Sequence, residues 1–306
     1  MTDAWILRGS AGTGFRAPTP GQISSVSVQS VVNANEPRTA GIFPADDPAS
    51  RIFGSVPLTD ETSEQLSIGL AFQPSDAFTM TLDYYFIALD DRIWVSSRFD
   101  VGPDERAQLI ALGAPGADQL TSVRFFNNDM DTETQGIDLV AQYGIDWSAG
   151  NTLLSLAVNY NETKVTRRTN RQTDPNNPDP VYFLREVDVF RLEEGSPQYR
   201  ANITAMHSWT DNLSATLRGN WYSNYTYTPN NQRYFQEVSS APYWDLDVTW
   251  HPSDVITLTL GGRNVFDAAP DPFDVSDTCC GAIVDGFSVM DWQGPYYYLR
   301  GIFNWN

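Results

Sequence analysis

Apolar and polar residues alternate one by one along most of this chain. In a β-strand, successive side chains point to opposite faces, so a period of two predicts strands with one apolar and one polar face. The run from Trp244 to Val248 is a clear case, because Asp245 and Asp247 alternate with its apolar residues. Two acids opposite an apolar face indicate that one side of the strand meets water. Such runs, counted from Trp5 to Trp305, predict ten strands.

The connections between the ten expected strands alternate in length. Four are tight polar turns, at residues 73–76, 148–151, 210–212 and 251–254. Five are long, covering about residues 14–62, 97–121, 167–195, 227–241 and 267–294. Because the long loops occupy every second connection, they all lie at one end of the strands. Within the second long loop, a short helix is expected over residues 104–112. Loops this long are usually functional or disordered.

An aromatic residue precedes each of the four tight turns. These residues are Phe72, Trp147, Trp209 and Trp250. Short turns at one end, long loops at the other and aromatic side chains near the turns are typical of membrane-spanning β-barrels. The pattern predicts an all-β fold, an antiparallel transmembrane β-barrel segment of about ten strands.

Composition narrows the class of protein. The chain has 306 residues, of which 19% are charged, and no apolar run approaches the ~20 residues that a transmembrane helix needs. The net charge of −19 argues against nucleic-acid binding, which depends on cationic contacts to phosphate. Aromatic residues make up 13%, which fits either a packed core or interfacial girdles, and their positions before the turns favour girdles.

Two other architectures fit part of the pattern. A soluble β-sandwich or propeller, including a carbohydrate-binding or enzymatic β protein, also has alternating strands. Strands of roughly nine or more residues and the sorting of loops by length argue against it. A complete ten-stranded porin-like barrel is the other alternative, and it requires the first and last strands to pair.

Four stretches of sequence resemble TonB-dependent outer-membrane receptors. They are residues 8–19, with Phe15-Arg16-Ala17-Pro18; residues 61–70; residues 134–139, with Thr134-Gln135-Gly136-Ile137-Asp138; and residues 262–267, with Asn264-Val265-Phe266-Asp267. Their order matches that of the family, and together they span nearly the whole chain. The resemblance implies a location in the Gram-negative outer membrane.

The resemblance also implies that the chain is incomplete. The family fold is a 22-stranded barrel with an N-terminal plug, so residues 1–306 are expected to carry the last ten strands, without the plug and without a signal peptide. The tight turns then lie on the periplasmic side, which makes Phe72, Trp147, Trp209 and Trp250 a periplasmic girdle. The implied function is energised uptake of a scarce nutrient of the siderophore-iron, cobalamin or glycan class.

The resemblance implies several partners and no catalytic role. Outer-membrane lipid, lipopolysaccharide and the barrel-assembly machinery are the expected partners, with the plug and TonB in the intact receptor. Phe303 and Trp305 have the spacing of the family's C-terminal assembly signal, although Asn306 follows them. Phe15 and Arg16 are candidates for a ligand or plug contact at the barrel mouth, or Arg16 has a structural role.

Charged residues on the polar faces form a second candidate group. Their expected role is an ion-pair lattice facing the lumen, and they are Arg200, Arg218, Asp245, Asp247 and Arg300. The arginine cluster at residues 167–171 either meets lipopolysaccharide phosphates or is solvated.

No catalytic, cofactor or metal site is expected. Asp267, Asp271, Asp274 and Asp277 do not match the spacing of a calcium loop. His207 and His251 are isolated, and the adjacent Cys279 and Cys280 are read as incidental thiols or a strained pair.

Overall fold

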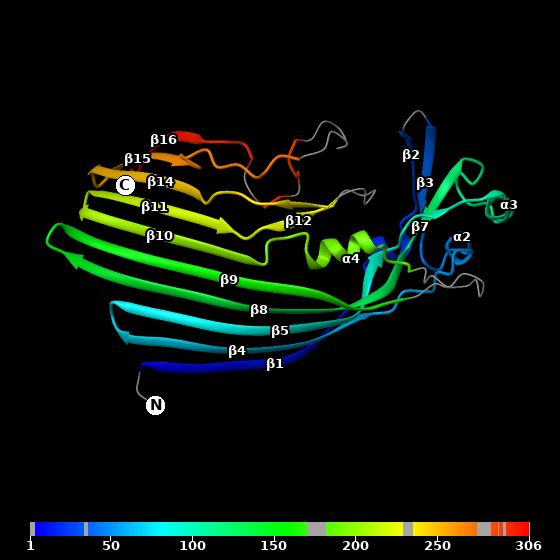
Figure 1. Cartoon of the computed structure of the whole chain (residues 1–306), viewed down its shortest axis with the longest axis horizontal. Helices are drawn as coiled ribbons and strands as arrows, with labels where there is room; N and C mark the ends of the chain where they lie inside the picture. The colour runs from blue at the N-terminus through cyan, green and yellow to red at the C-terminus, as the bar shows by residue number, and fades with distance from the viewer. Residues whose placement is uncertain are drawn as a thin grey trace.

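A ten-stranded antiparallel sheet forms most of the molecule (Figure 1). The computed structural model describes residues 4–33, 36–169, 182–228, 235–273, 283–286, 288–289 and 292–305. Each of these strands after the first is hydrogen-bonded to the strand of this sheet that precedes it in the sequence. The strands are β1 (Trp5–Arg16), β4 (Glu61–Ser75), β5 (Phe78–Val95), β8 (Phe126–Trp147), β9 (Gly150–Arg168), β10 (Tyr199–Thr210), β11 (Leu213–Tyr222), β14 (Tyr243–Ser253), β15 (Ile256–Arg263) and β16 (Tyr296–Phe303). The predicted ten strands are confirmed.

The two edges of this sheet do not meet. Within the described residues, β1 pairs with β4 alone and β16 pairs with β15 alone. The sheet is therefore open, as expected for part of a larger barrel. A closed ten-stranded barrel would need hydrogen bonds between β1 and β16, so the structure argues against that alternative.

The tight turns all lie at one end of the sheet, on the left in Figure 1. The turn between β8 and β9 depends on Gly150, whose φ is +125°. A Cβ atom added there would lie 2.0 Å from the carbonyl oxygen of Ser208 on β10. Only glycine adopts this conformation at so close an approach, so the turn sequence fixes where β8 ends and β9 begins.

The long connections lie at the other end and contain structure of their own. A second sheet has the order β2 (Ser27–Asn33), β3 (Glu36–Ile42), β7 (Leu120–Arg124) and β6 (Phe99–Asp100). Helices α2 (Pro48–Arg51) and α3 (Pro103–Ala111) lie beside it (Figure 1). We call these six elements the cap. The helix expected over residues 104–112 is confirmed as α3.

Further short elements complete the long connections. Helix α1 (Pro20–Ser24) follows β1, and α4 (Glu186–Glu193) precedes β10. The hairpin of β12 (Tyr225–Tyr227) and β13 (Gln236–Val238) lies between β11 and β14. None of the helices in the described residues is long and apolar enough to span a membrane.

The larger buried core lies in the cap and not in the ten-stranded sheet. Phe43, Leu109, Leu120 and Phe125 are fully buried and belong to one cluster, which draws residues from the first three long connections. Apolar residues of the large sheet, such as Ile203, are instead exposed. This distribution fits a sheet whose apolar face is solvated by lipid and a cap that meets water.

Candidate functional site

Strand register sorts the large sheet into one apolar and one polar face. Leu7, Leu70, Leu82, Leu139 and Val158 are successive pairing partners across five strands and form one apolar row. The next positions along the same strands form a polar row of Arg8, Gly69, Asp83, Asp138 and Asn159. The alternation read from the sequence is thus preserved from strand to strand.

Aromatic side chains mark the apolar face near the tight turns. Trp5 stacks on Phe72 with ring centroids 4.0 Å apart, and Phe72 meets Phe78 edge to face at 6.1 Å. Trp147, Trp209 and Trp250 are exposed at the same end. The four residues expected to form the periplasmic girdle therefore lie at the same end of the sheet, next to the tight turns.

A second aromatic row crosses the same face farther from the turns. Tyr84, Ile137, Tyr160 and Tyr199 are successive pairing partners, and the rings of Tyr160 and Tyr199 lie 4.8 Å apart. Beyond this row, the face carries charged residues such as Glu64 and Lys164. The span from Trp147 to Ile137, which is the pairing partner of Tyr160, would cover roughly 25 Å in a tilted strand, the height of an outer-membrane apolar band.

An ion-pair network occupies the polar face of β11, β14, β15 and β16. Asp245 lies 3.7 Å from Arg218 and 3.2 Å from Arg263. Asp247 lies 3.6 Å from Arg263 and accepts a 2.5 Å hydrogen bond from the Tyr298 hydroxyl. Three of the five expected lattice residues, Arg218, Asp245 and Asp247, are therefore brought together.

Two members of this network were not expected from the sequence, and two expected members lie outside it. Arg263 and Tyr298 complete the network; Arg263 stands directly before the Asn264-Val265-Phe266-Asp267 stretch, and Tyr298 lies on the polar side of the last strand. Arg200 and Arg300 form no ion pair within the part of the chain that the structure describes.

Arg16 and Phe15 lie on opposite faces at the end of β1. Arg16 donates to the carboxylate of Glu61, its register partner, and Glu61 also accepts the N–H of Ile93 at 2.6 Å. Burial by itself raises the pKa of Glu61, but these hydrogen bonds outweigh it and leave that pKa below its usual value. Phe15 is 77% exposed on the other face.

The arginines that begin the third long connection are paired with acids. Arg167 donates to Asp131 at 2.5 Å and to Asp91 at 2.7 Å, and Arg168 donates to Glu186 at 2.7 Å. The hydrogen bonds that Arg167 donates to Asp131 raise the pKa of Arg167. These two cations are thus already neutralised locally, which weakens the expectation of lipopolysaccharide phosphate binding; Arg171 lies outside the described residues.

Asp129 is a buried acid at the cap end of β8. Its side chain is 1% exposed, and neither carboxylate oxygen has a hydrogen-bond partner among the described residues. Burial raises the pKa of Asp129 to about 6. Its neighbour Asp131 differs: burial alone would raise the pKa of Asp131, but the hydrogen bonds it accepts from Arg167 and from the N–H of Asp91 outweigh this and lower that pKa.

The other candidates form no metal site among the described residues. No group of three or more His, Cys, Asp or Glu residues there could hold a metal ion. His207 is hydrogen-bonded to Thr152, and Asp271 accepts from Ser239. Asp274, Asp277, Cys279 and Cys280 lie outside the described residues.

Comparison with known proteins agrees with this geometry. A family model described as "TonB dependent receptor-like, beta-barrel" matches residues 1–265. No curated protein matches the chain. Among solved structures, the siderophore receptor PirA from Acinetobacter baumannii aligns with a TM-score of 0.56 at 15% identity, covering 99% of this chain and 39% of that one.

Two further structures show the same fold. The FrpB iron transporter from Neisseria meningitidis (F5-1 variant) aligns with a TM-score of 0.57 at 12% identity, over 98% of this chain and 37% of that one. The outer-membrane transporter YddB from Escherichia coli aligns with a TM-score of 0.54 at 14% identity, covering 80% of this chain and 33% of that one. This chain thus spans less than two fifths of each of these three proteins. The matched family, the open ten-stranded sheet and its two aromatic rows agree: the chain belongs to the TonB-dependent receptor family and represents part of its outer-membrane β-barrel.

Proposed function

We propose that this chain is part of a receptor for the energised uptake of a scarce nutrient, a transporter and not an enzyme. The observation that carries the proposal is the cap. Three long connections at one end of the sheet share a buried core around Phe125. A folded surface at the outer end of a membrane barrel is suited to capturing a ligand, because loops held by a rigid scaffold present binding residues in fixed positions.

Iron bound to a siderophore is the substrate class that we favour. PirA is titled a siderophore receptor and FrpB an iron transporter, and both align with nearly the whole of this chain. At identities of 15% and 12%, these likenesses establish only a common fold. Cobalamin and glycans are therefore the competing classes in the experiment below.

In the intact receptor, the polar face of the sheet would meet the plug. The network of Arg218, Asp245, Asp247 and Arg263 supplies both charges on that face and would order plug side chains through hydrogen bonds. TonB would act on the plug, and the barrel-assembly machinery would read Phe303, the last residue of β16, and Trp305, which follows that strand. Outer-membrane lipid would cover the apolar face.

Ligand binding by the full chain in detergent tests the proposal. The probes are a ferric catecholate siderophore, cyanocobalamin and maltoheptaose, each followed by quenching of tryptophan fluorescence. We expect saturable binding of the ferric siderophore, about tenfold tighter than that of the other two, a difference of ~1.4 kcal/mol. Leu109→Ala, which opens the cap core, should weaken it, whereas Ile110→Ala should not.

Two results would count against the proposal. If none of the three probes showed saturable binding, the proposal that the cap captures a ligand would be wrong. If cyanocobalamin or maltoheptaose bound most tightly, iron-siderophore would not be the substrate class. We also expect that the 306-residue chain alone cannot perform coupled transport. Uptake dependent on the proton-motive force in cells that make only this chain would contradict that expectation.

A further inference from the structure

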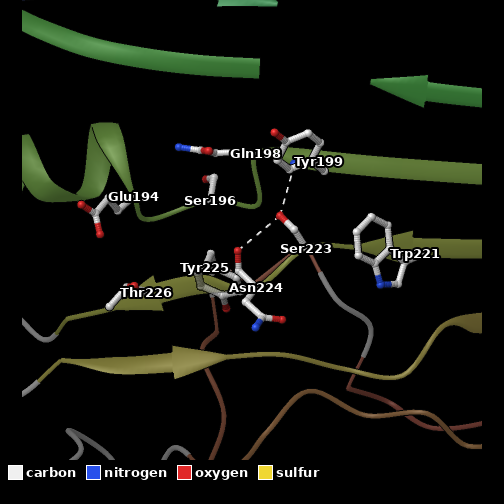
Figure 2. A pocket seen from close by; sticks show the side chains of 9 residues that line it. All are labelled: Glu194, Ser196, Gln198, Tyr199, Trp221, Ser223, Asn224, Tyr225 and Thr226. Atoms are coloured by element: carbon white, nitrogen blue, oxygen red, sulfur yellow. Dashed lines mark hydrogen bonds between the residues drawn. The ribbon is translucent and has the colours of Figure 1, made fainter. Parts of the chain in front are cut away.

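A cavity of about 490 Å³ opens where β10 begins and β11 ends (Figure 2). Its aromatic lining consists of Tyr199 and Trp221, from the two neighbouring strands, and of Tyr225 at the start of β12. Its polar lining includes Glu194, Ser196 and Gln198, which lie between α4 and β10. Ser223, Asn224 and Thr226 add further polar groups, so the cavity offers both aromatic and polar surface.

The two aromatic residues that β10 and β11 contribute to the cavity lie on the apolar face of the sheet. Tyr199 is the register partner of Tyr160, and Trp221 is the partner of Ala201; both belong to the apolar face. Arg200 and Tyr222, which point to the polar face, are not among the lining residues. The site thus lies at the second aromatic row, on the side of the barrel that contacts lipid and not on the side of the lumen.

The lining favours an uncharged polar ligand. No lysine or arginine lines the cavity, so it lacks the cations that recognise phosphate. Glu194 and Gln198 form hydrogen bonds only through their backbone, and the side chains of Glu194, Ser196 and Gln198 form none within the described residues, so they are available to hydroxyl groups. Tyr199 is 47% exposed and Trp221 is 42% exposed, and such aromatic faces offer apolar area beside polar groups.

We propose that this cavity binds the sugar headgroup of an outer-leaflet glycolipid. A pyranose ring combines an apolar C–H face, suited to Trp221, with hydroxyl groups suited to Gln198 and Glu194. The apolar row that continues from Trp221 to Ala201 would lie beside the acyl chains. The proposal rests on the membrane position of the apolar face and is independent of which nutrient the receptor takes up.

Native mass spectrometry of the full chain tests this site. The protein is held in tetraethylene glycol monooctyl ether, a detergent without sugar, and receives equal amounts of monoglucosyl diacylglycerol and phosphatidylglycerol with the same acyl chains. We expect the glucolipid to be retained about fivefold more than phosphatidylglycerol, equivalent to ~1 kcal/mol. Trp221→Leu and Gln198→Leu should each abolish this preference.

Trp209→Leu is the matched control, because it removes an exposed tryptophan at the opposite end of β10, and it should retain the preference. Circular dichroism identifies any variant that fails to fold. If Trp221→Leu does not fold, the result for Gln198→Leu tests the proposal, because this variant leaves the aromatic lining intact. Equal retention of the two lipids, or stronger retention of phosphatidylglycerol, would overturn the proposal. Displacement of the glucolipid by soluble methyl glucoside would assign the cavity to free sugars and would also overturn it.

Discussion

Arg8 on β1 and Asp83 on β5 form a two-pronged ion pair across the strand between them. The Nε and Nη2 atoms of Arg8 donate to the two carboxylate oxygens at 2.9 and 2.6 Å. Gly69 on β4 is the register partner of both residues. A Cβ atom at Gly69 would lie 1.9 Å from Asp83 Oδ1 and 2.7 Å from Arg8 Nε, so the pair forms only because this position has no side chain.

The same arrangement occurs twice more on the polar face. In each case a glycine on the middle strand leaves room for a side-chain hydrogen bond between its two neighbours. The bonds are those of Asn161 to Tyr85 across Gly136, at 2.6 Å, and of Tyr298 to Asp247 across Gly261, at 2.5 Å. Bridges of this kind fasten three strands together instead of two.

Gly69→Ala should break the bridge between Arg8 and Asp83. The added methyl group displaces both side chains, and overpacking of this kind costs about 1–3 kcal/mol. We expect a lower midpoint of urea unfolding in detergent. Gly12→Ala is the matched control, since Gly12 lies on the same face and its Cβ would come no nearer than 3.4 Å to the flexible side chain of Gln65. Equal midpoints for the two variants would show that the bridge contributes nothing.

Leu109→Ala should unfold the cap while leaving the large sheet intact. Leu109 is fully buried in the cap core, and truncating such a leucine costs about 2–5 kcal/mol. Hydrogen exchange followed by mass spectrometry should show faster exchange in β3 and β7, with β9 and β10 unchanged. Ile110→Ala, the adjacent and 54% exposed position, should leave all four strands unchanged. Faster exchange in β9 with Leu109→Ala would mean that cap and sheet unfold as one unit.

The sequence revealed the large sheet better than the cap, for a physical reason. Strict alternation identifies β9 and β10 because each has one lipid-facing side over the part that lies between the two aromatic rows. The cap sheet depends on a parallel pairing of β3 with β7, which joins Gly41 to Val123 across two different long connections. No local pattern signals a partner so distant in sequence. Pro37 and Gly41 further weaken the strand signal of β3.

Only part of the ion-pair network on the polar face could be predicted from the sequence, for a similar reason. Asp245 and Asp247 could be placed on one face by periodicity alone. Two of their partners could not, because Arg263 and Tyr298 reach them only through the register between strands and through the space at Gly261. A glycine in an alternating run signals a close approach, but the side chain that fills the space becomes evident only in the structure.

The wild-type protein should lose stability as pH rises toward about 6, because Asp129 must ionise while buried. The Asp129→Asn variant should not show this loss. The pKa of Asp129 is raised in the folded protein, so folded chains bind more protons than unfolded chains between about pH 4 and 6, and the free energy of unfolding falls as pH rises through that range. A shift from 3.8 to about 6 corresponds to about 3 kcal/mol. Urea unfolding at pH 5 and pH 7.5 measures the effect.

The wild-type protein should therefore be less stable at pH 7.5 than the asparagine variant, and the two should converge at low pH. Glu61 and Asp131 have lowered pKa values, so their contributions are lost only below about pH 4 and do not interfere. A wild-type protein that is no less stable at pH 7.5 than at pH 5 would indicate that Asp129 is not a strained, uncompensated acid.

Tyr298→Phe should weaken the attachment of the last strand. The substitution removes only the hydroxyl group that donates to Asp247, and a hydrogen bond of this kind contributes about 1 kcal/mol. Hydrogen exchange in β16 should increase. Tyr296→Phe serves as the control, because Tyr296 lies on the same strand and face without a hydroxyl hydrogen bond in the described residues. Similar exchange in both variants would assign the effect to the ring and not to the hydroxyl.

Spin-label accessibility along β9 tests most directly whether the large sheet is part of a membrane barrel. Single labels at residues 153–160 of the full chain, with Cys279 and Cys280 replaced by serine, are measured in phosphatidylcholine vesicles. We predict that oxygen, which concentrates in lipid, reaches labels at Leu154, Leu156 and Val158 more readily than labels at residues 155, 157 and 159. Uniform accessibility, or access of a water-soluble nickel reagent to the labels at the apolar positions, would contradict the membrane assignment of that face.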